Sequence, residues 1–90
     1  MKRAFKLGQI VITSNADSVL EYEDVGVALL RHASCDWGKI RKEDKEANDF
    51  AVDNNINRIL SVYHDSKGTK FWIITEADRS ATTILLPEDY

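Results

Sequence analysis

The chain has 90 residues, of which 43% are hydrophobic and 30% are charged, so it is long enough for one globular domain and too apolar to be disordered throughout. A single cysteine excludes an internal disulfide, and no apolar run approaches the about 20 residues that a membrane-spanning helix needs. A net charge of −3 with few clustered basic residues disfavours binding to nucleic-acid phosphates.

The first half of the chain predicts one strand followed by three helices. β-branched residues mark the strand, and apolar residues spaced three and four apart mark the two longer helices. Two good N-cap residues precede the short helix. The strand is expected over residues 6–13, and the helices over residues 16–22, 25–33 and 42–53.

The second half predicts three consecutive strands, over residues 58–64, 69–75 and 82–86. Gly68 completes a hairpin turn over residues 65–68, and Pro87 ends the last strand because it has no N–H to donate. The sequence therefore predicts a single α+β domain over residues 1–90. Three short helices pack on a mainly antiparallel four-stranded sheet, in the order β-α-α-α-β-β-β.

The predicted strands are apolar on both faces. Residues 71–74 and 84–86 do not alternate between apolar and polar side chains, as a sheet with one solvated face would. The helices can cover one face, and the rest of the chain is too short to cover the other fully. A homodimer contact is one way to cover the rest of this face, and the alternative is a few large side chains that lie half exposed.

The two histidines and the cysteine are candidates for a metal site or a nucleophile. His32 and Cys35 form a His-x-x-Cys pair, and Asp36 and His64 are possible further ligands. A zinc site usually needs a second such pair, which is lacking. Cys35 with a histidine also lacks a motif for an orienting residue or an oxyanion hole. We expect no metal, no cofactor and no catalytic residue.

Asp36, Trp37 and Gly38 are three functionally suggestive residues in one turn. In one interpretation Trp37 is an exposed anchor at a protein interface, where tryptophan is enriched, and Asp36 lies beside it. In the structural interpretation Asp36 binds nearby backbone N–H groups, Trp37 packs over the edge of the core and Gly38 permits the bend.

The helix expected over residues 42–53 is strongly acidic, and Asp44 and Asp49 are its candidate binding residues. Its negative charges could imitate phosphates and occupy a basic groove on a nucleic-acid-binding partner. The alternative is an acidic helix face that is simply solvated. The acidic residues of this segment are Glu43, Asp44, Glu46, Asp49 and Asp53.

The connection around residues 76–83 mixes charges with hydroxyl groups. Arg79 could bind an anion through two N–H groups, and Asp78 could act with Glu76 as an acid or a base. Ser80 and Thr83 complete this candidate site. The alternative is a turn in which Asp78 pairs with Arg79 and Ser80 caps the bend.

Four segments of the sequence form a recognisable pattern. They are residues 31–38 (RHASCDWG), 43–45 with 48–49, 58–63 (RILSVY) and, most specifically, the C-terminal string WIITEADRSATTILLPEDY of residues 72–90. These segments resemble a family of small bacterial mobile-element proteins. Members of the family occur on plasmids, integrative elements and prophages and are described as plasmid-related proteins. The resemblance implies a role in plasmid upkeep or in resistance to host defence, with no established activity. Glycine is usual in the family at the position of Cys35.

Three functions are open at this point. The first is a non-enzymatic binding protein of a mobile element, which occupies a host-defence or plasmid-maintenance protein through the acidic helix and the Trp37 region. The second is a small enzyme or ligand-binding domain that uses the 76–83 loop. The third is a nucleic-acid binder that uses Lys2, Arg3 and Lys6 together with exposed aromatic side chains. The single cysteine and the lack of a signal-peptide pattern predict a cytoplasmic location.

Overall fold

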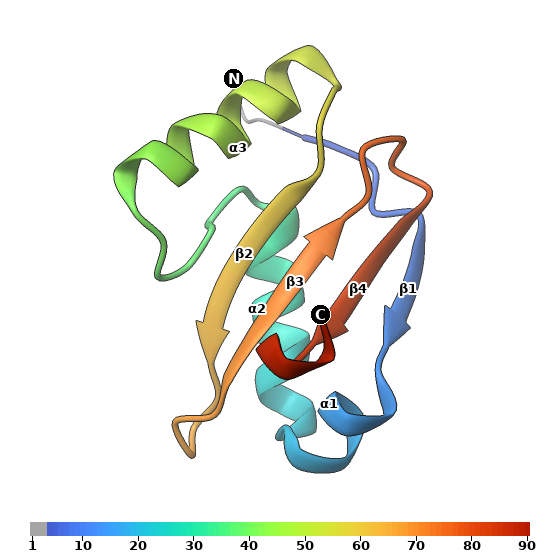
Figure 1. The fold of residues 1–90 in the computed structure, drawn as a ribbon, viewed down its shortest axis with the longest axis vertical. Helices are drawn as coiled ribbons and strands as arrows, with labels where there is room; N and C mark the ends of the chain where they lie inside the picture. Colours follow the sequence, from blue (N-terminus) through green and yellow to red (C-terminus); the bar gives the residue numbers. More distant parts are fainter. Residues whose placement is uncertain (1–3) are drawn as a thin grey trace.

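The computed structural model describes residues 4–90, which form a four-stranded sheet with helices around it (Figure 1). The elements in chain order are β1 (Gln9–Ile12), α1 (Ser14–Val19), α2 (Tyr22–Ala33), α3 (Lys42–Asn54), β2 (Ile59–His64), β3 (Lys70–Thr75), β4 (Ala81–Leu85) and the 3₁₀ turn η1 (Pro87–Asp89). The strand order is β1-β4-β3-β2; β1 is parallel to β4, and the other neighbours are antiparallel. The predicted fold class and element order are confirmed.

The first strand and the first helix differ from their predicted boundaries. β1 ends at Ile12 because Thr13 caps α1, its Oγ1 accepting a hydrogen bond from the N–H of Ala16 at 3.2 Å. Leu20 then has an extended backbone, which ends α1 at Val19. The sequence predicted that Tyr22 ends the first helix, whereas in the structure it begins α2.

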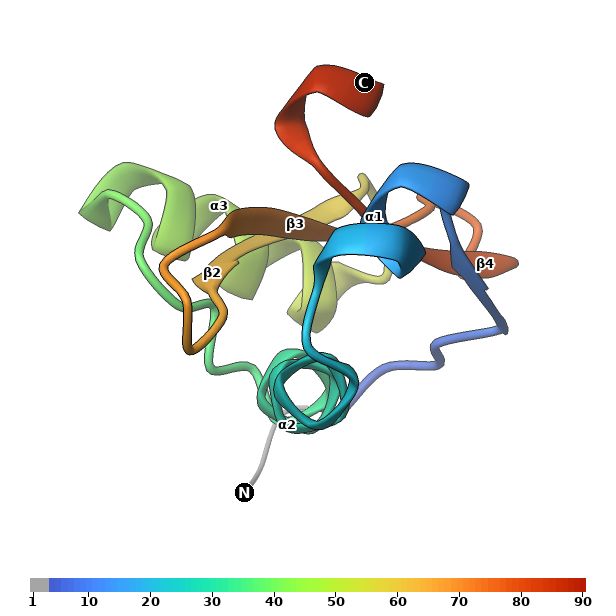
Figure 2. The same cartoon turned by 90° about the horizontal axis from the view of Figure 1, so that it is seen from below.

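The main core lies between α2 and one face of the sheet. Phe71, Ile73 and Ile84 of the sheet are at most 2% exposed, and the small side chain of Ala28 lets α2 approach them closely. Figure 2 shows α2 on one side of the sheet and η1 on the other. A second cluster joins α3 to β2 and is built from Trp37, Ala51, Val52 and Ile59.

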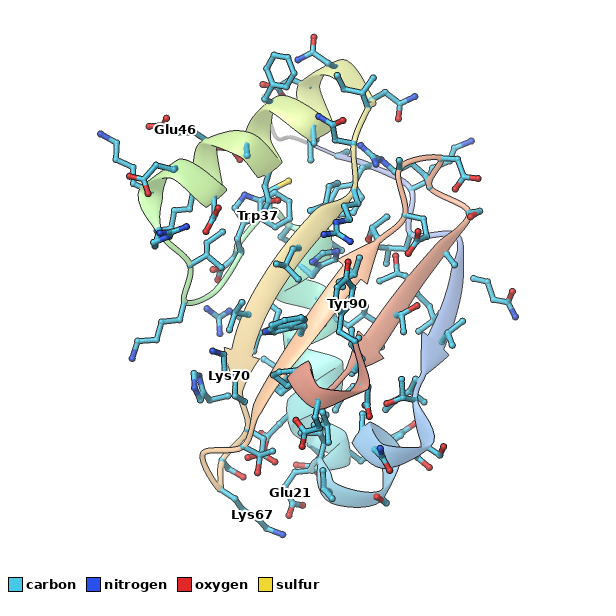
Figure 3. All side chains as sticks on the ribbon, in the orientation of Figure 1. Glu21, Trp37, Glu46, Lys67, Lys70 and Tyr90 are labelled. Atoms are coloured by element: carbon cyan, nitrogen blue, oxygen red, sulfur yellow. The ribbon has the colours of Figure 1, made fainter. Side chains whose placement is uncertain are left out.

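The face of the sheet opposite α2 is largely buried within the chain. Ile74 and Leu85 on this face are each only 5% exposed. The ring of Tyr90 lies 5.7 Å from the ring of Trp72, over the middle of the sheet (Figure 3). Most of this face therefore needs no second copy to bury it, so a homodimer has to use another surface.

The two longer helices end in left-handed residues. Asn55 has a φ of 53° after α3, and Cys35 has a φ of 65° after α2. Glycine adopts this conformation without steric cost, whereas Cys35 occupies it with a side chain. No helix within residues 4–90 is both long enough and apolar enough to cross a membrane.

Candidate functional site

The outer edge of β2 is closed by side-chain and loop contacts. The side-chain amide of Asn48 donates to the Leu60 carbonyl at 2.7 Å and accepts from the Leu60 N–H at 3.2 Å. The next outward-facing residue, Val62, donates its N–H to the Trp37 carbonyl at 3.1 Å and accepts from the Lys39 N–H at 2.9 Å. These contacts occupy the backbone groups through which another strand would pair.

The other edge of the sheet, formed by β1, is open. Gln9 and Thr13 donate their N–H groups to Ser80 and Ile84 on the β4 side, both at 3.0 Å. Since backbone groups of successive strand residues point to opposite sides, those of Ile10 and Ile12 point away from β4. Among residues 4–90, no strand pairs with β1 on that side.

β1 also exposes apolar side chains at this edge. Ile10, Val11 and Ile12 are 45%, 38% and 38% exposed. Ile10 and Ile12 pair with Thr82 and Ile84 and therefore lie on the α2 face, whereas Val11 lies on the opposite face. Soluble proteins normally protect a sheet edge with charges, proline or covering loops, so this short apolar edge is a candidate binding surface.

An apolar groove of about 300 Å³ lies between β1, α1 and α2. Buried Ile84 and Ala16 form part of its wall, and Asp17 is its single charged residue. The full lining is Ile10, Ile12, Ala16, Asp17, Leu20, Tyr22, Val25, Gly26, Leu29 and Ile84. Its size and composition are typical of a site that receives apolar groups.

An exposed apolar stripe on α2 extends the groove. Tyr22, Gly26 and Leu30 are four residues apart and so lie above one another on the helix. Tyr22 is 89% exposed and Leu30 is 71% exposed. A Cβ atom placed on Gly26 would meet nothing within 4 Å, so the stripe is open at its centre. The groove and the stripe together form one apolar surface, which we call the β1–α2 surface.

Trp37 does not lie on an accessible surface. Its side chain is 3% exposed, and its Nε1–H donates to Asp49 Oδ1 at 3.0 Å. Figure 3 shows it between α3 and the sheet. The interpretation of Trp37 as an exposed anchor is therefore wrong, because its indole fills the second core cluster.

Asp36 is exposed and pairs with Arg31. The guanidinium of Arg31 donates to both carboxylate oxygens of Asp36, at 2.8 and 3.2 Å, and this contact lowers the pKa of Asp36. The N–H of Gly38 also reaches Asp36, at 3.4 Å. Asp36 therefore supports its own turn, as the structural interpretation predicted.

The acidic helix splits into an inner and an outer part. Asp49 is half-buried against Trp37, whereas Asp44 is exposed, with its carboxylate 3.5 Å from the Arg41 guanidinium. Asp44 and Asp49 therefore do not present one acidic face to a partner.

Arg79 has a structural role that the sequence did not reveal. Its side chain is only 7% exposed, and its guanidinium donates to backbone carbonyls from α3 and the loops around it. The accepting carbonyls belong to Ala51, Ile56, Asn57, Glu76 and Ala77, at 2.6–3.2 Å. The prediction of an anion-binding arginine is wrong, because its terminal N–H groups are used within the chain.

Asp78 and Ser80 remain on the surface of the loop. Asp78 accepts a hydrogen bond from the Ser80 N–H at 2.9 Å, and its contacts with Ser80 lower its pKa. Asp78, and not Ser80, therefore caps the bend, and the predicted pair of Asp78 with Arg79 is not formed. Asp78 and Arg79 line a shallow depression with residues 4–6, while Ser80 and Asp36 lie elsewhere.

The sequence did not reveal a series of linked hydrogen bonds between buried polar side chains on the α2 face of the sheet. The carbonyl of Leu7 can only accept, so Thr82 Oγ1 donates to it at 2.7 Å and accepts from Thr75 Oγ1 at 2.7 Å. Thr75 in turn accepts from His32 Nε2–H at 2.8 Å. Ser61 Oγ then donates to His32 Nδ1 at 2.5 Å. This order requires an N–H at Nε2, and in the neutral imidazole Nδ1 then accepts from Ser61.

Burial has a large effect on His32. The side chain is 0% exposed, and desolvation lowers its pKa from 6.5 to about 4. Its two nitrogens are occupied by hydroxyl groups, so His32 stabilises the core and is not available as a ligand or a base. Within residues 4–90, no three His, Cys, Asp or Glu side chains are grouped so that they could hold a metal ion.

Comparison with models of protein families, with curated proteins and with solved structures found no match to this chain. The resemblance to mobile-element proteins therefore stays a prediction. Of the basic residues in the nucleic-acid hypothesis, Lys2 and Arg3 lie outside the described residues, and Lys6 is exposed.

Proposed function

We propose that this chain is a non-enzymatic protein-binding domain, which holds an apolar helix of a partner protein in the groove between β1 and α2. The observation that carries the proposal is the continuous apolar lining of the β1–α2 surface. This surface includes Tyr22, which is almost fully exposed, and Leu30, which is largely exposed. Such a surface is unfavourable in water and is typical of the centre of a protein interface.

A helix suits this groove because α2 covers only part of the sheet. Figure 2 shows α2 end-on beneath the sheet, and the strand order places β1 beyond β4, at the edge of the sheet. Ile10 and Ile12 on the same face stay half exposed. A second helix about 10 Å wide, laid beside α2, would cover them and complete the helical layer.

The charges at the surface suggest the character of the partner. Asp17 lines the groove, and Glu23 is exposed on the first turn of α2. A partner helix with basic residues beside its apolar face would be attracted to this acidic rim. Calmodulin-like recognition of basic amphipathic helices uses the same combination of apolar burial and opposite charge.

The contacts of the chemically suggestive residues favour a binding role over an enzymatic one. The guanidinium of Arg79 binds backbone carbonyls, and His32 is enclosed by hydroxyl groups in the core. From the family resemblance alone, we further propose that the partner is a host-defence or plasmid-maintenance protein of the cytoplasm, met by a mobile element.

The proposal is tested by photo-cross-linking in cells that carry the native gene. A photoreactive phenylalanine analogue replaces Tyr22 at the rim of the groove or, as a control, Glu46, which projects from α3 away from the sheet (Figure 3). Irradiation should join the chain to a second protein from position 22 and not from position 46, and mass spectrometry identifies the adduct.

Two matched variants ask whether the groove itself is needed. Gly26→Leu fills the groove from an open position on α2 and also raises helix propensity, so it should not unfold the domain. Val27→Leu changes the next residue, which is exposed and does not line the groove. Loss of the adduct in Gly26→Leu with retention in Val27→Leu is expected. An adduct that survives Gly26→Leu, or that forms only from position 46, would refute the proposal.

A further inference from the structure

We propose that two copies of this chain pair through the open edge of β1, in an antiparallel arrangement whose two-fold axis passes beside Val11. The two four-stranded sheets then form one continuous sheet. This inference goes beyond the proposed function, because it uses the backbone edge of β1, whereas the proposed partner helix lies beside α2. The two surfaces share the side chains of Ile10 and Ile12, which line the groove.

The backbone of β1 has the groups that such pairing requires. The N–H and C=O groups of Ile10 and Ile12 point away from β4, as the bonds of Gln9 and Thr13 toward β4 show. Around a two-fold axis at Val11, Ile10 of one copy faces Ile12 of the other, and both residues exchange N–H···O=C bonds. Each copy thus provides hydrogen-bond partners for the outward-pointing backbone N–H and C=O groups of the other copy.

The side chains of β1 are self-complementary in this register. The sequence Ile10-Val11-Ile12 reads the same in both directions, so isoleucine meets isoleucine on the α2 face and valine meets valine on the other. Gln9 then lies opposite Thr13, which pairs polar with polar. β1 contains no charged residue, so two copies approach without the like-charge repulsion that protects many sheet edges.

The closed edge of β2 favours a dimer over a longer assembly. Asn48 and the segment from Trp37 to Lys39 occupy the outward backbone groups of Leu60 and Val62. A second copy can therefore not add its β1 to that edge. With one edge open and the other closed, the pairing is isologous and ends at two copies.

The first test measures the molecular mass of the purified chain by sedimentation equilibrium over a range of concentrations. The native chain should dimerise. Val11→Lys places two positive charges opposite each other at the axis and should weaken dimerisation at least about tenfold. Thr83→Lys is the matched control, because Thr83 is the neighbour of Val11 on the same face, one strand away from the edge. It should leave the dimer largely intact.

The second test fixes the register. In a Cys35→Ser background, Val11→Cys should form a disulfide between two copies on mild oxidation, since the non-hydrogen-bonded pair at the axis brings two Cα atoms to about 4.5 Å, within the range for a disulfide. Thr83→Cys in the same background should not cross-link. The Val11→Cys cross-link tests the pairing independently of Val11→Lys. The inference can therefore be refuted even if Val11→Lys fails to fold.

A chain that stays monomeric at high concentration and does not cross-link through position 11 overturns the inference. A dimer that is equally stable in Val11→Lys overturns it as well, because another surface would then hold the copies together. Either result leaves the proposed function standing if the adduct from position 22 is still lost in Gly26→Leu. Conversely, a dimer that cross-links at position 11 without any groove-dependent adduct supports the pairing and refutes the proposed function.

Discussion

The buried histidine should make the stability of this domain depend on pH between about 4 and 6.5. His32 has both ring nitrogens in hydrogen bonds, and the bonds from Thr75 to the Leu7 carbonyl require an N–H at Nε2, so Nδ1 of the neutral ring accepts from Ser61. Protonation would add a second N–H facing Ser61, whose hydroxyl would have to reverse. It would also place a charge in a site that is 0% exposed.

The magnitude follows from the pKa of His32 in the folded and unfolded states. Burial lowers this pKa from 6.5 to about 4, a difference that corresponds to about 3 kcal/mol of unfolding free energy. Because the folded pKa is depressed, the unfolded chain binds more protons in this interval. The stabilisation is complete above pH 6.5 and is lost as the pH falls toward 4, and most of it should be gone by pH 4.5.

Urea denaturation at a series of pH values measures this effect. Exposed carboxylates whose pKa values are lowered, such as Asp36, also reduce stability in acid, so the native chain must be compared with a variant. His32→Gln suits this purpose, because its amide can accept from Ser61 and donate to Thr75 without titrating. The stability difference between the two proteins should shrink as the pH falls.

His64 is the matched control for this experiment. It is the second histidine of the chain and lies exposed at the end of β2. The native chain and His64→Gln should show the same loss of stability in acid. The reasoning is refuted if His32→Gln follows the native pH profile in parallel, or if the NMR signals of the His32 ring titrate near 6.5.

Three further substitutions test the contacts that shape the sheet and the helices. Gly26→Ala should raise the unfolding free energy by about 0.5–1 kcal/mol in urea denaturation, because alanine is a better helix former and its Cβ meets nothing; a loss of stability would contradict this. Asn48→Ala should lower it by about 1–3 kcal/mol, since two backbone groups of Leu60 lose their partner, and amide exchange at Leu60 should accelerate. Arg79→Lys should lower the unfolding free energy by a similar amount, because an ammonium cannot donate to the same set of backbone carbonyls. Wild-type stability of this variant would show that the guanidinium hydrogen bonds contribute little.

Local pattern was enough to place the helices and strands. Helical spacing of apolar residues in α2 and the stop at Asn55 depend on neighbours a few residues apart, so the sequence carries them directly. The same applies to the turn at Gly68, which needs only a residue that tolerates positive φ. The start of α1 was misplaced because the cap at Thr13 was assigned to its neighbours. The start of α2 was misplaced because the extended Leu20 ends α1 early and leaves Tyr22 to the next helix.

The sequence predicted the strand that forms the candidate site but not the position of this strand in the sheet. The run Ile10-Val11-Ile12 reads as a strand, but nothing local says that it lies at an edge or that it is parallel to β4, a pairing that joins residues about 70 positions apart. The aromatic Trp37 and the charged Arg79 suggested function, because tryptophan and arginine are common at interfaces and anion sites. Their burial depends on the packing of the whole chain. Trp37 packs against α3, and backbone carbonyls surround the guanidinium of Arg79.

The sequence by itself determined the α+β class, the order of the elements and the supply of apolar residues, since these follow from backbone preferences and short-range periodicity. Only the tertiary structure decided that Asn48 and the segment after Trp37 close one edge of the sheet while β1 stays open at the other. The physical reason is that a backbone N–H or C=O group is present at every residue. Which of these groups remain unpaired depends on what the rest of the chain brings beside them.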